Sequence, residues 1–383
     1  MNLLFDMITT CRRTGAGEYV RRVFFSLLES VQLQRGVNIF CLYDSKRGFG
    51  YNDLTLDCLK KYGVETIDVN GQNLQTIISH YHIDRVFIGC AQFWQDYQGI
   101  EDLECEVVCV IHDLSHQEKF RNHITEYCKL RKHSMLSLSY SLWRLRRREG
   151  SNRKLDAFIS LAKRNPKTQI VVVSDYTRSS LQYLTDIPME RVQVLYSPLR
   201  LPPDERPIEN RQVAELINSG ERFFVLLGAH ISLKGGFKAI PAFARYIETG
   251  GRGKLLTIGR GIRKEYDCQV VAGFICDSDL DAVFRHCHAL IYPSLFEGFG
   301  YPPLEAMRYG KPVICSNACS IPQVLGDAPI YFSPFYETAV YQALNIFDQS
   351  DYDTLAERSR RQYNTVHERQ ERDLQSLLNI LTH

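Results

Sequence analysis

The feature that most constrains the fold of this chain is an alternation of short apolar runs with amphipathic segments from end to end. The runs are rich in Val, Ile and Leu, and strands are expected over residues 3–7, 37–42, 85–88, 107–111, 170–173, 223–227, 255–258, 288–292 and 312–315. Helices are expected between them, over residues 17–28, 236–247, 279–286 and 303–309. Continuous apolar strands separated by helices are typical of parallel sheets covered on both faces. The pattern therefore predicts an α/β protein of the doubly wound type.

Length and proline distribution predict two domains. The chain has 383 residues, and a domain takes roughly 150 residues. Prolines and charged residues cluster over 198–220, which favours a linker there. We expect a Rossmann-like domain over 1–200 and a second one over 201–364, facing one another across a central cleft. We also expect a C-terminal helix, about 365–383, to pack back on the first domain.

Composition excludes several classes of protein. Apolar residues make up 44% and charged residues 23%, as in ordinary globular proteins. No apolar run approaches the roughly 18 residues of a membrane-spanning helix, and the N-terminus lacks the pattern of a signal peptide. The 12 cysteines form no CxxC pair, so reduced thiols are expected. The net charge of +2 does not indicate a nucleic-acid partner. These features predict a cytoplasmic protein.

One segment departs from the near-neutral balance of basic and acidic residues. Residues 129–154 contain nine basic residues and one acidic residue, Glu149. Apolar side chains recur there at helical spacing, at Met135, Leu138, Leu142 and Leu145. A basic amphipathic helix can bind an anionic membrane surface, which predicts peripheral association with the inner face of a membrane. An ordinary surface helix packed on its own domain is the alternative.

The densest chemical signal lies in residues 294–334. The expected strand over 288–292 leads into a turn with two glycines, and Pro302 and Pro303 suit the first turn of a following helix. A loop that runs into a helix N-terminus can bind an anion. Glu297 precedes the glycines, and Glu305 is expected in the first helical turn. Alone, Glu305 could be a carboxylate placed at a helix dipole and Glu297 a solvated loop residue.

The frame EGFGYPPLEAMRYGKPVI, which spaces Glu297 and Glu305 eight positions apart, resembles the signature of retaining glycosyltransferases of the GT4 group. These enzymes have the GT-B fold, with two Rossmann-like domains. The similarity extends to residues 14–23, 109–114, 171–184, 226–236 and 273–294. The resemblance implies that the first domain binds the acceptor and the second binds the nucleotide sugar.

The resemblance also implies roles for single residues in the second domain. Glu305 would bind the ribose, Glu297 the hydroxyls of the donor sugar, and Lys234 the diphosphate. A lysine at Lys234 makes chemical sense because charge builds on the leaving phosphate, although a solvated loop lysine is the alternative. Backbone N–H groups would meet the sugar or diphosphate at Phe299, Gly300 and Tyr301.

Further roles follow from the same resemblance. Gly273 and Phe274 would contact the base, although Phe274 could instead belong to the core. His112 would approach the donor sugar as a third catalytic residue beside Glu297 and Lys234, with a core or capping histidine as the alternative. The loop with Gly15 and Gly17 would face the donor phosphate and the acceptor.

The chain departs from the family pattern at three positions. Many members carry arginine before the lysine, where this chain has Ala229 and Leu233. Many have glutamate where this chain has Gln323. Diphosphate binding would then depend on Lys234 with another group, for which Arg260 is a candidate.

The sequence therefore predicts a retaining hexosyltransferase that needs no cofactor and no metal. The donor would be a GDP- or UDP-linked hexose, and the acceptor a glycan or lipid-linked glycan in surface polysaccharide synthesis. A nucleotide-sugar epimerase and a donor-binding, non-catalytic partner subunit are the alternatives. A NAD enzyme is a further alternative, because Gly15 and Gly17 precede Asp44, placed where an acid could bind a ribose.

Overall fold

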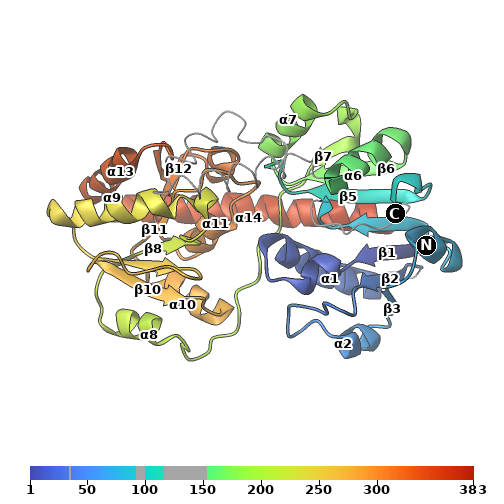
Figure 1. Cartoon of the computed structure of the whole chain (residues 1–383), viewed down its shortest axis with the longest axis horizontal. Helices are drawn as coiled ribbons and strands as arrows, with labels where there is room; N and C mark the ends of the chain where they lie inside the picture. Colours follow the sequence, from blue (N-terminus) through green and yellow to red (C-terminus); the bar gives the residue numbers. More distant parts are fainter. Residues whose placement is uncertain (34–35, 92–99, 116–152) are drawn as a thin grey trace, which may run out of the picture. The chain divides into compact units, whose positions relative to one another are not determined.

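The structure is a computed structural model that describes residues 1–33, 36–91, 100–115 and 153–383. The chain divides into two compact units (Figure 1). Unit 1 comprises residues 1–200 and 370–383, and unit 2 comprises residues 201–369. The basic segment predicted over 129–154 lies outside the described residues, apart from the start of α6 (Arg153–Arg164).

Unit 1 is built on a parallel sheet of seven strands in the order β3-β2-β1-β4-β5-β6-β7. The strands are β1 (Asn2–Asp6), β2 (Asn38–Tyr43), β3 (Glu65–Asp68), β4 (Arg85–Ile88), β5 (Glu106–Ile111), β6 (Thr168–Val172) and β7 (Val192–Val194). Its longer helices are α1 (Gly15–Leu33), α2 (Leu56–Lys61), α3 (Leu74–His80), α6 and α7 (Asp175–Leu184). Leu4 of β1 pairs with Phe40 on one side and Val86 on the other, and its side chain is fully buried. The apolar run at the N-terminus is therefore a central strand.

Unit 2 repeats this design with a parallel sheet of six strands in the order β10-β9-β8-β11-β12-β13. The strands are β8 (Phe223–Leu227), β9 (Lys254–Ile258), β10 (Gln269–Gly273), β11 (Ala289–Tyr292), β12 (Val313–Ser316) and β13 (Ile330–Phe332). The helices are α8 (Arg211–Asn218), α9 (Gly236–Glu248), α10 (Asp277–His286), α11 (Tyr301–Arg308), α12 (Ile321–Leu325), α13 (Glu337–Gln349) and the start of α14 (Tyr352–Thr382). Phe224 packs edge-on against Phe243 and Phe347, whose helices α9 and α13 cover one face of the sheet. The doubly wound α/β fold is confirmed in both units.

The strands that were not predicted from the sequence are all edge strands. They are β3, β7, β10 and β13, the outermost strands of the two sheets. An edge strand is covered less completely, so it is short and keeps polar residues such as Glu65 and Gln193. β3 and β7 therefore lack the continuous apolar run by which the central strands were recognised, whereas β10 and β13 contain only short ones.

The stretch predicted as a linker, 198–220, contains helix α8. Asn210 caps this helix because its side chain accepts a hydrogen bond from Val213 N at 3.2 Å. The Asp279 carboxylate receives the backbone N–H groups of Glu209 and Asn210, each at 2.9 Å. Within 198–220, residues 201–210 contain no helix or strand.

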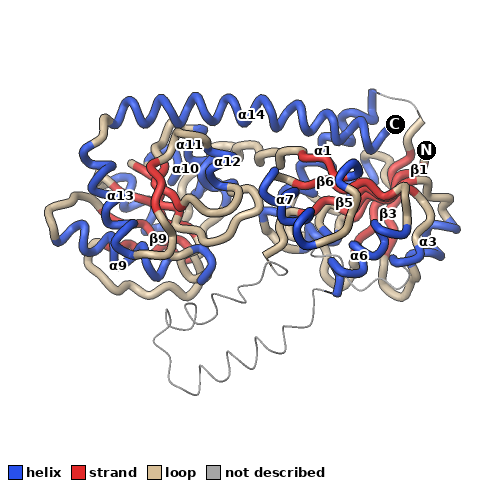
Figure 2. The backbone as a smooth tube through the Cα atoms, turned by 90° about the horizontal axis from the view of Figure 1, so that it is seen from above, coloured by secondary structure: helices blue, strands red, loops and turns tan. Residues whose placement is uncertain are grey.

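Helix α14 is continuous over 31 residues (Figure 2) and contributes to both units. It begins at Tyr352, earlier than the helix expected over about 365–383. Its last turns bond to unit 1, since Tyr196 N donates to Asp373 at 2.7 Å and Arg85 donates to the carbonyl of Ile380. Among the helices within the described ranges, none is both long and apolar enough to cross a membrane.

Candidate functional site

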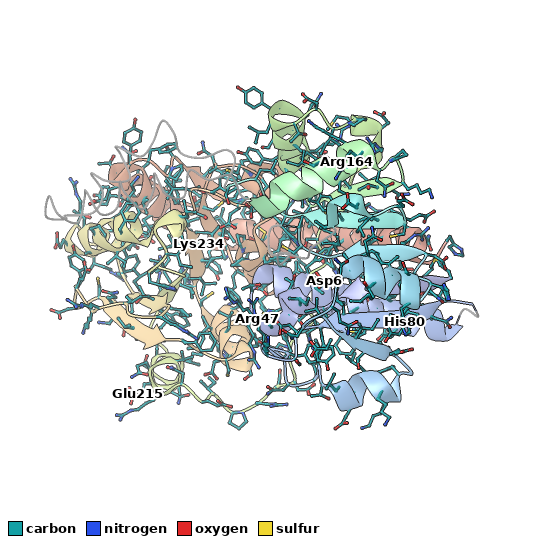
Figure 3. The ribbon with its side chains drawn as sticks, turned by 45° about the vertical axis from the view of Figure 1, so that its right-hand side comes forward. Asp6, Arg47, His80, Arg164, Glu215 and Lys234 are labelled. Atoms are coloured by element: carbon teal, nitrogen blue, oxygen red, sulfur yellow. The ribbon has the colours of Figure 1, made fainter. Side chains whose placement is uncertain are left out.

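The candidate site of unit 2 lies at the point where the strand order reverses. The chain winds outward from β8 to β9 and β10 on one side, and from β11 to β12 and β13 on the other. Loops that follow β8 and β11 leave the sheet in opposite directions, and ligands of doubly wound folds bind in the resulting crevice. Lys234, labelled in Figure 3, follows β8, and Glu297 follows β11.

Close backbone packing joins these two loops. Leu295 N donates a hydrogen bond to Leu233 O at 2.7 Å. Gly235 has φ of 70°, and a Cβ at this position would lie 2.1 Å from the carbonyl oxygen of Pro293. Only glycine allows this approach without displacement. The backbone thus brings Lys234 beside the loop after β11.

Four side chains meet there and form the switch-point cluster: Lys234, Tyr292, Ser294 and Glu297. Glu297 Oε1 accepts from Tyr292 Oη and Ser294 Oγ, each at 2.5 Å, and from Lys234 Nζ, with which it forms an ion pair. Lys234 Nζ also donates to Tyr292 Oη at 3.3 Å. The side chains of Lys234 and Glu297 are 28% and 11% exposed, so a ligand can reach the ammonium.

The electrostatics of the cluster keep its tyrosine neutral. Burial, together with the charge of Glu297 and the hydrogen bond to it, raises the pKa of Tyr292 well above its ordinary value. The phenol therefore stays protonated and donates to the carboxylate. The cluster offers a cation that an anionic ligand can attract and a carboxylate that can accept from a hydroxyl group.

Helix α11 begins two residues earlier than predicted and carries Glu305 in its second turn. Gly300, with φ of 93°, occupies the N-cap, and the prolines occupy the first turn, where no N–H is needed. The prediction that Glu305 lies in the first turn is therefore wrong. Its side chain is buried at 7% exposure.

Phe299 and Tyr301 flank Gly300 and lie close together. Their ring centroids are 5.6 Å apart, and Phe299 is buried at 4% exposure. The backbone N–H groups predicted to bind the sugar or diphosphate are thus those of the N-cap and its neighbours, at the start of α11.

The residues predicted to contact the base, Gly273 and Phe274, lie at the carboxyl end of β10, and Arg260, the candidate second group for the diphosphate, follows β9. Gly273 ends β10 with φ of 69°, and its carbonyl accepts from Gly259 N at 2.8 Å. Phe274 follows with 62% of its surface exposed, so the alternative of a core phenylalanine is wrong. The guanidinium carbon of Arg260 lies 5.4 Å from the centre of its ring. An exposed ring beside a cation can stack on a planar base.

The candidate residues of unit 1 gather at the reversal point of its own sheet, between β1 and β4. His112 follows β5 and its Nε2 donates to Gly89 O, after β4, at 2.9 Å. Its ring packs edge-on against Tyr19 of α1, with centroids 4.8 Å apart. Burial lowers the pKa of His112 despite that hydrogen bond and the charge of Asp113, so the ring is neutral at pH 7.

Gly15 and Gly17 begin helix α1, close to the same point. A Cβ on Gly17 would lie 2.5 Å from the carbonyl oxygen of Arg12, which explains glycine there. Asp44, the acid of the NAD alternative, is held by its own turn and by the turn after β3. Its Oδ1 accepts from Lys46 N and Asn70 Nδ2, each at 2.9 Å. The structure thus gives Asp44 a local structural role.

The two positions at which the family resemblance predicted arginine, Ala229 and Leu233, contribute to backbone packing here. Leu233 O accepts from Leu295 N and from Ser294 Oγ at 3.3 Å. A Cβ on Gly236 would lie 2.6 Å from the Cα of Ala229, so the chain is tightly packed at Ala229 as well.

Sequence reasoning gave no role to Tyr292 or Ser294. Tyr292 was interpreted as the last residue of a strand, and both residues flank Pro293 in the sequence. The available signal was their position: hydroxyl side chains at the carboxyl end of a central strand, just before a glycine-rich loop.

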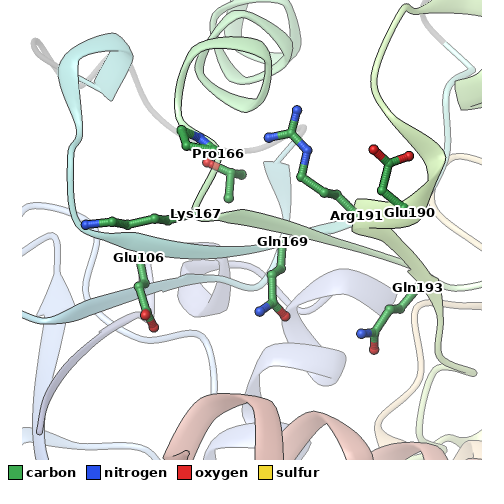
Figure 4. A pocket seen from close by; sticks show the side chains of 8 residues that line it. Glu106, Pro166, Lys167, Gln169, Glu190, Arg191 and Gln193 are labelled. Atoms are coloured by element: carbon green, nitrogen blue, oxygen red, sulfur yellow. The ribbon is translucent and has the colours of Figure 1, made fainter.

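A separate polar hollow of about 310 Å³ lies in unit 1 (Figure 4). It is lined at the amino ends of β5, β6 and β7, by residues that include Glu106, Thr168 and Arg191. His112 follows the carboxyl end of β5, at the opposite edge of the sheet. The hollow is therefore distinct from the candidate residues of unit 1.

Comparison with known proteins identifies relatives among glycosyltransferases. Residues 208–360 match the model of the family described as glycosyl transferases group 1. The chain is 31% identical over 185 residues to O-antigen chain mannosyltransferase B of Escherichia coli, covering 43% of this chain and 47% of that protein. It is 26% identical over 192 residues to an MMP alpha-(1->4)-mannosyltransferase of Mycolicibacterium hassiacum, covering 45% and 43%. The chain thus spans about half the length of these relatives.

Solved structures of similar fold cover the whole chain. HepE of Anabaena, in complex with UDP and glucose, has a TM-score of 0.65 at 13% identity and covers 100% of this chain and 99% of its own. WaaG, a glycosyltransferase involved in lipopolysaccharide biosynthesis, has a TM-score of 0.61 at 15% identity and covers 100% of both chains. These likenesses show that the chain has the GT-B fold.

Proposed function

Because residues 208–360 match the group 1 glycosyltransferases and the chain has the GT-B fold, we propose that it is a retaining hexosyltransferase of the GT4 group. It transfers a hexose from a GDP- or UDP-linked donor to a glycan or lipid-linked glycan in surface polysaccharide synthesis. Because both of these relatives are named as mannosyltransferases, mannose is the first hexose to test.

The observation that carries the proposal is the switch-point cluster. The Lys234 ammonium and the Glu297 carboxylate lie in contact at the carboxyl ends of β8 and β11, where such folds bind ligands. In the donor complex, Lys234 binds the diphosphate and Glu297 accepts from hydroxyls of the sugar. Glu305 binds the ribose, and Phe274 with Gly273 contacts the base.

The reaction follows from the charges of this site. The bond between the anomeric carbon and the β-phosphate oxygen breaks, and charge grows on that phosphate. Lys234 stabilises this charge, together with the N–H groups at residues 299–301. The acceptor hydroxyl attacks the same face of the sugar, and the departing phosphate oxygen takes its proton. Configuration is thereby retained without a covalent intermediate and without a metal.

Two side chains that could act as nucleophiles are otherwise engaged. Ser174 accepts from Thr177 N at 3.2 Å as the cap of α7. Glu297 is assigned in this proposal to the hydroxyls of the donor sugar, and three donors hold its Oε1. These contacts support direct displacement over a glycosyl-enzyme intermediate.

Unit 1 supplies the acceptor side of the proposal. The neutral ring of His112 approaches the donor sugar, and the start of α1 at Gly15 and Gly17 faces the donor phosphate and the acceptor. For a lipid-linked acceptor, the protein binds the cytoplasmic face of a membrane through its basic segment, 129–154. Flotation with anionic liposomes tests this part: neutralising Arg144, Arg146, Arg147 and Arg148 is expected to abolish flotation, and unchanged flotation would contradict it.

A donor panel tests the function. The protein is incubated with GDP-mannose, UDP-glucose and UDP-N-acetylglucosamine in excess chelator, and nucleoside diphosphate is measured with the anomeric configuration of the released sugar. Slow release of nucleoside diphosphate with a retained α-configured sugar is expected. Inverted product contradicts retention, and dependence on added metal contradicts metal independence. An isomerised nucleotide sugar indicates the epimerase, and binding without turnover indicates a non-catalytic subunit.

A further inference from the structure

The two carboxylate oxygens of Glu297 differ in the hydrogen bonds that they accept. Oε1 accepts from Lys234, Tyr292 and Ser294. Within the described part of the chain, Oε2 accepts no hydrogen bond from protein. One oxygen of Glu297 is therefore anchored, and the other is available to a ligand.

The three donors to Oε1 are not equivalent. The Ser294 hydroxyl has a single proton, and three acceptors lie within its reach: Glu297 Oε1 at 2.5 Å, Phe296 O at 3.2 Å and Leu233 O at 3.3 Å. The phenol of Tyr292 donates at 2.5 Å to Glu297. Tyr292 thus gives its one proton to Glu297, whereas Ser294 divides its proton among several oxygens.

The sheet fixes the position of this phenol. Tyr292 is the last residue of β11, is paired in register with Cys315 of β12, and is buried at 2% exposure. A buried ring at the end of a central strand has little freedom to move. Its hydroxyl therefore has a fixed position beside the loop that carries Glu297.

The third donor, Lys234, is also assigned to the diphosphate in the proposed function. Its side chain is 28% exposed, so the ammonium can turn toward an anion. When it does so, Glu297 loses a charged donor while its carboxylate stays largely buried. A buried carboxylate without donors is costly, so another group must hold it. The ring of Tyr292 lies 5.4 Å from Lys234 Nζ and contacts both partners of the ion pair.

We propose that Tyr292 is a positioning residue for the donor sugar: its phenol anchors Glu297 through Oε1 and directs Oε2 at the sugar hydroxyls while Lys234 binds the diphosphate. This inference rests on the proposed function. It predicts that the phenol matters for the sugar part of the donor and not for its diphosphate part.

Calorimetry on the full chain separates these two parts. We compare the Kd of GDP and of GDP-mannose, and of UDP and of UDP-glucose, for wild type and Tyr292→Phe. Phenylalanine keeps the buried ring and removes only the hydroxyl. Nucleoside diphosphate affinity is expected to stay within about twofold, and nucleotide-sugar affinity to fall about tenfold or more, as for a lost hydrogen bond to a charged group.

Two further variants make the test specific. Tyr309→Phe removes another phenol-to-carboxylate hydrogen bond of unit 2, from Tyr309 Oη to Asp281 at 2.6 Å, and is expected to change neither affinity. In the Glu297→Ala background, Tyr292→Phe is expected to add nothing, because the phenol acts through that carboxylate.

The measured affinities distinguish a failure of this inference from a failure of the proposed function. Equal affinity of wild type and Tyr292→Phe for the nucleotide sugar would overturn the inference and leave the proposed function intact. An equal loss for nucleotide sugar and nucleoside diphosphate, or a full additional loss in the Glu297→Ala background, would also overturn it. Failure of wild type to bind any of these nucleotides would overturn the proposed function itself and the inference with it.

Discussion

Replacing Gly235 with alanine perturbs the contact that brings the two loops of the switch-point cluster together. Gly235 has φ of 70°, and left-handed backbone costs an L-residue roughly 1–2 kcal/mol. The new Cβ would also lie 2.1 Å from Pro293 O, a backbone atom that cannot move alone. Overpacking of this kind costs roughly 1–3 kcal/mol. We therefore expect Gly235→Ala to lower the free energy of unfolding of unit 2 by roughly 2–5 kcal/mol.

Gly220→Ala is the matched control. Gly220 has φ of 67°, also lies in unit 2, and no atom lies within 4 Å of a Cβ placed there. It carries the cost of the left-handed backbone without the clash, so its expected loss is roughly 1–2 kcal/mol. Urea unfolding followed by circular dichroism measures both variants. Because the two units can unfold separately, the transition of unit 2 is the one compared.

The same pair of variants tests the link from packing to donor binding. Displacing the loop after β8 from the loop after β11 separates Lys234 from Glu297, so folded Gly235→Ala is expected to bind nucleoside diphosphate more weakly than Gly220→Ala. Equal loss of stability in the two variants would refute the reasoning that close approach to Pro293, and not backbone conformation alone, requires glycine.

Further predictions concern pH and the ribose. Burial, with the charge of Arg222, lowers the pKa of His288 from 6.5 to about 4. The contribution of the neutral His288 ring to the free energy of unfolding is therefore present above pH 6.5 and is lost as pH falls through 4. His288→Phe keeps the stacking on Tyr352 and should flatten the pH dependence of urea unfolding over that range; an unchanged slope would contradict this. Burial raises the pKa of Asp6 from 3.8 to about 7, so its contribution is present below pH 3.8 and is lost as pH rises through 7. Asp6→Asn should therefore stabilise the protein more at pH 8 than at pH 5, and an equal gain at both would count against it. Glu305→Ala should weaken nucleotide binding about tenfold or more with unchanged circular dichroism; wild-type affinity would exclude the ribose role.

The central part of the fold was predictable from sequence because burial on both faces imposes continuous apolar runs. Residues 223–227 and 85–88 were predicted as strands with the bounds that the structure has. Edge strands such as β3 and β7 were not predicted, since partial exposure permits polar residues there. Helix α8 was assigned to a linker because its short amphipathic pattern lies among prolines and charges.

The candidate site was predictable only where a local motif carries it. Glu297 and Glu305 lie in one contiguous frame, and Lys234 lies in a recognisable loop. The role of Tyr292 was not predicted, because it depends on a cluster that also includes Lys234, 58 positions away in the sequence. That contact is created by the pairing of β8 with β11 and by the approach of Gly235 to Pro293. The start of α11 was misplaced because two adjacent prolines each suit a helical first turn.

The most direct test of the central claim, that the switch-point cluster binds a nucleoside diphosphate group, is calorimetric titration of Lys234→Ala with GDP and UDP. Lys254→Ala is the matched control: its side chain is 33% exposed and lies 4.0 Å from Glu221 in the same unit. Wild type and Lys254→Ala should bind the same nucleotide with equal Kd. Lys234→Ala should bind it about a hundredfold more weakly, as for a lost charge-assisted contact of roughly 2.7 kcal/mol. Equal Kd for Lys234→Ala and wild type would contradict the claim.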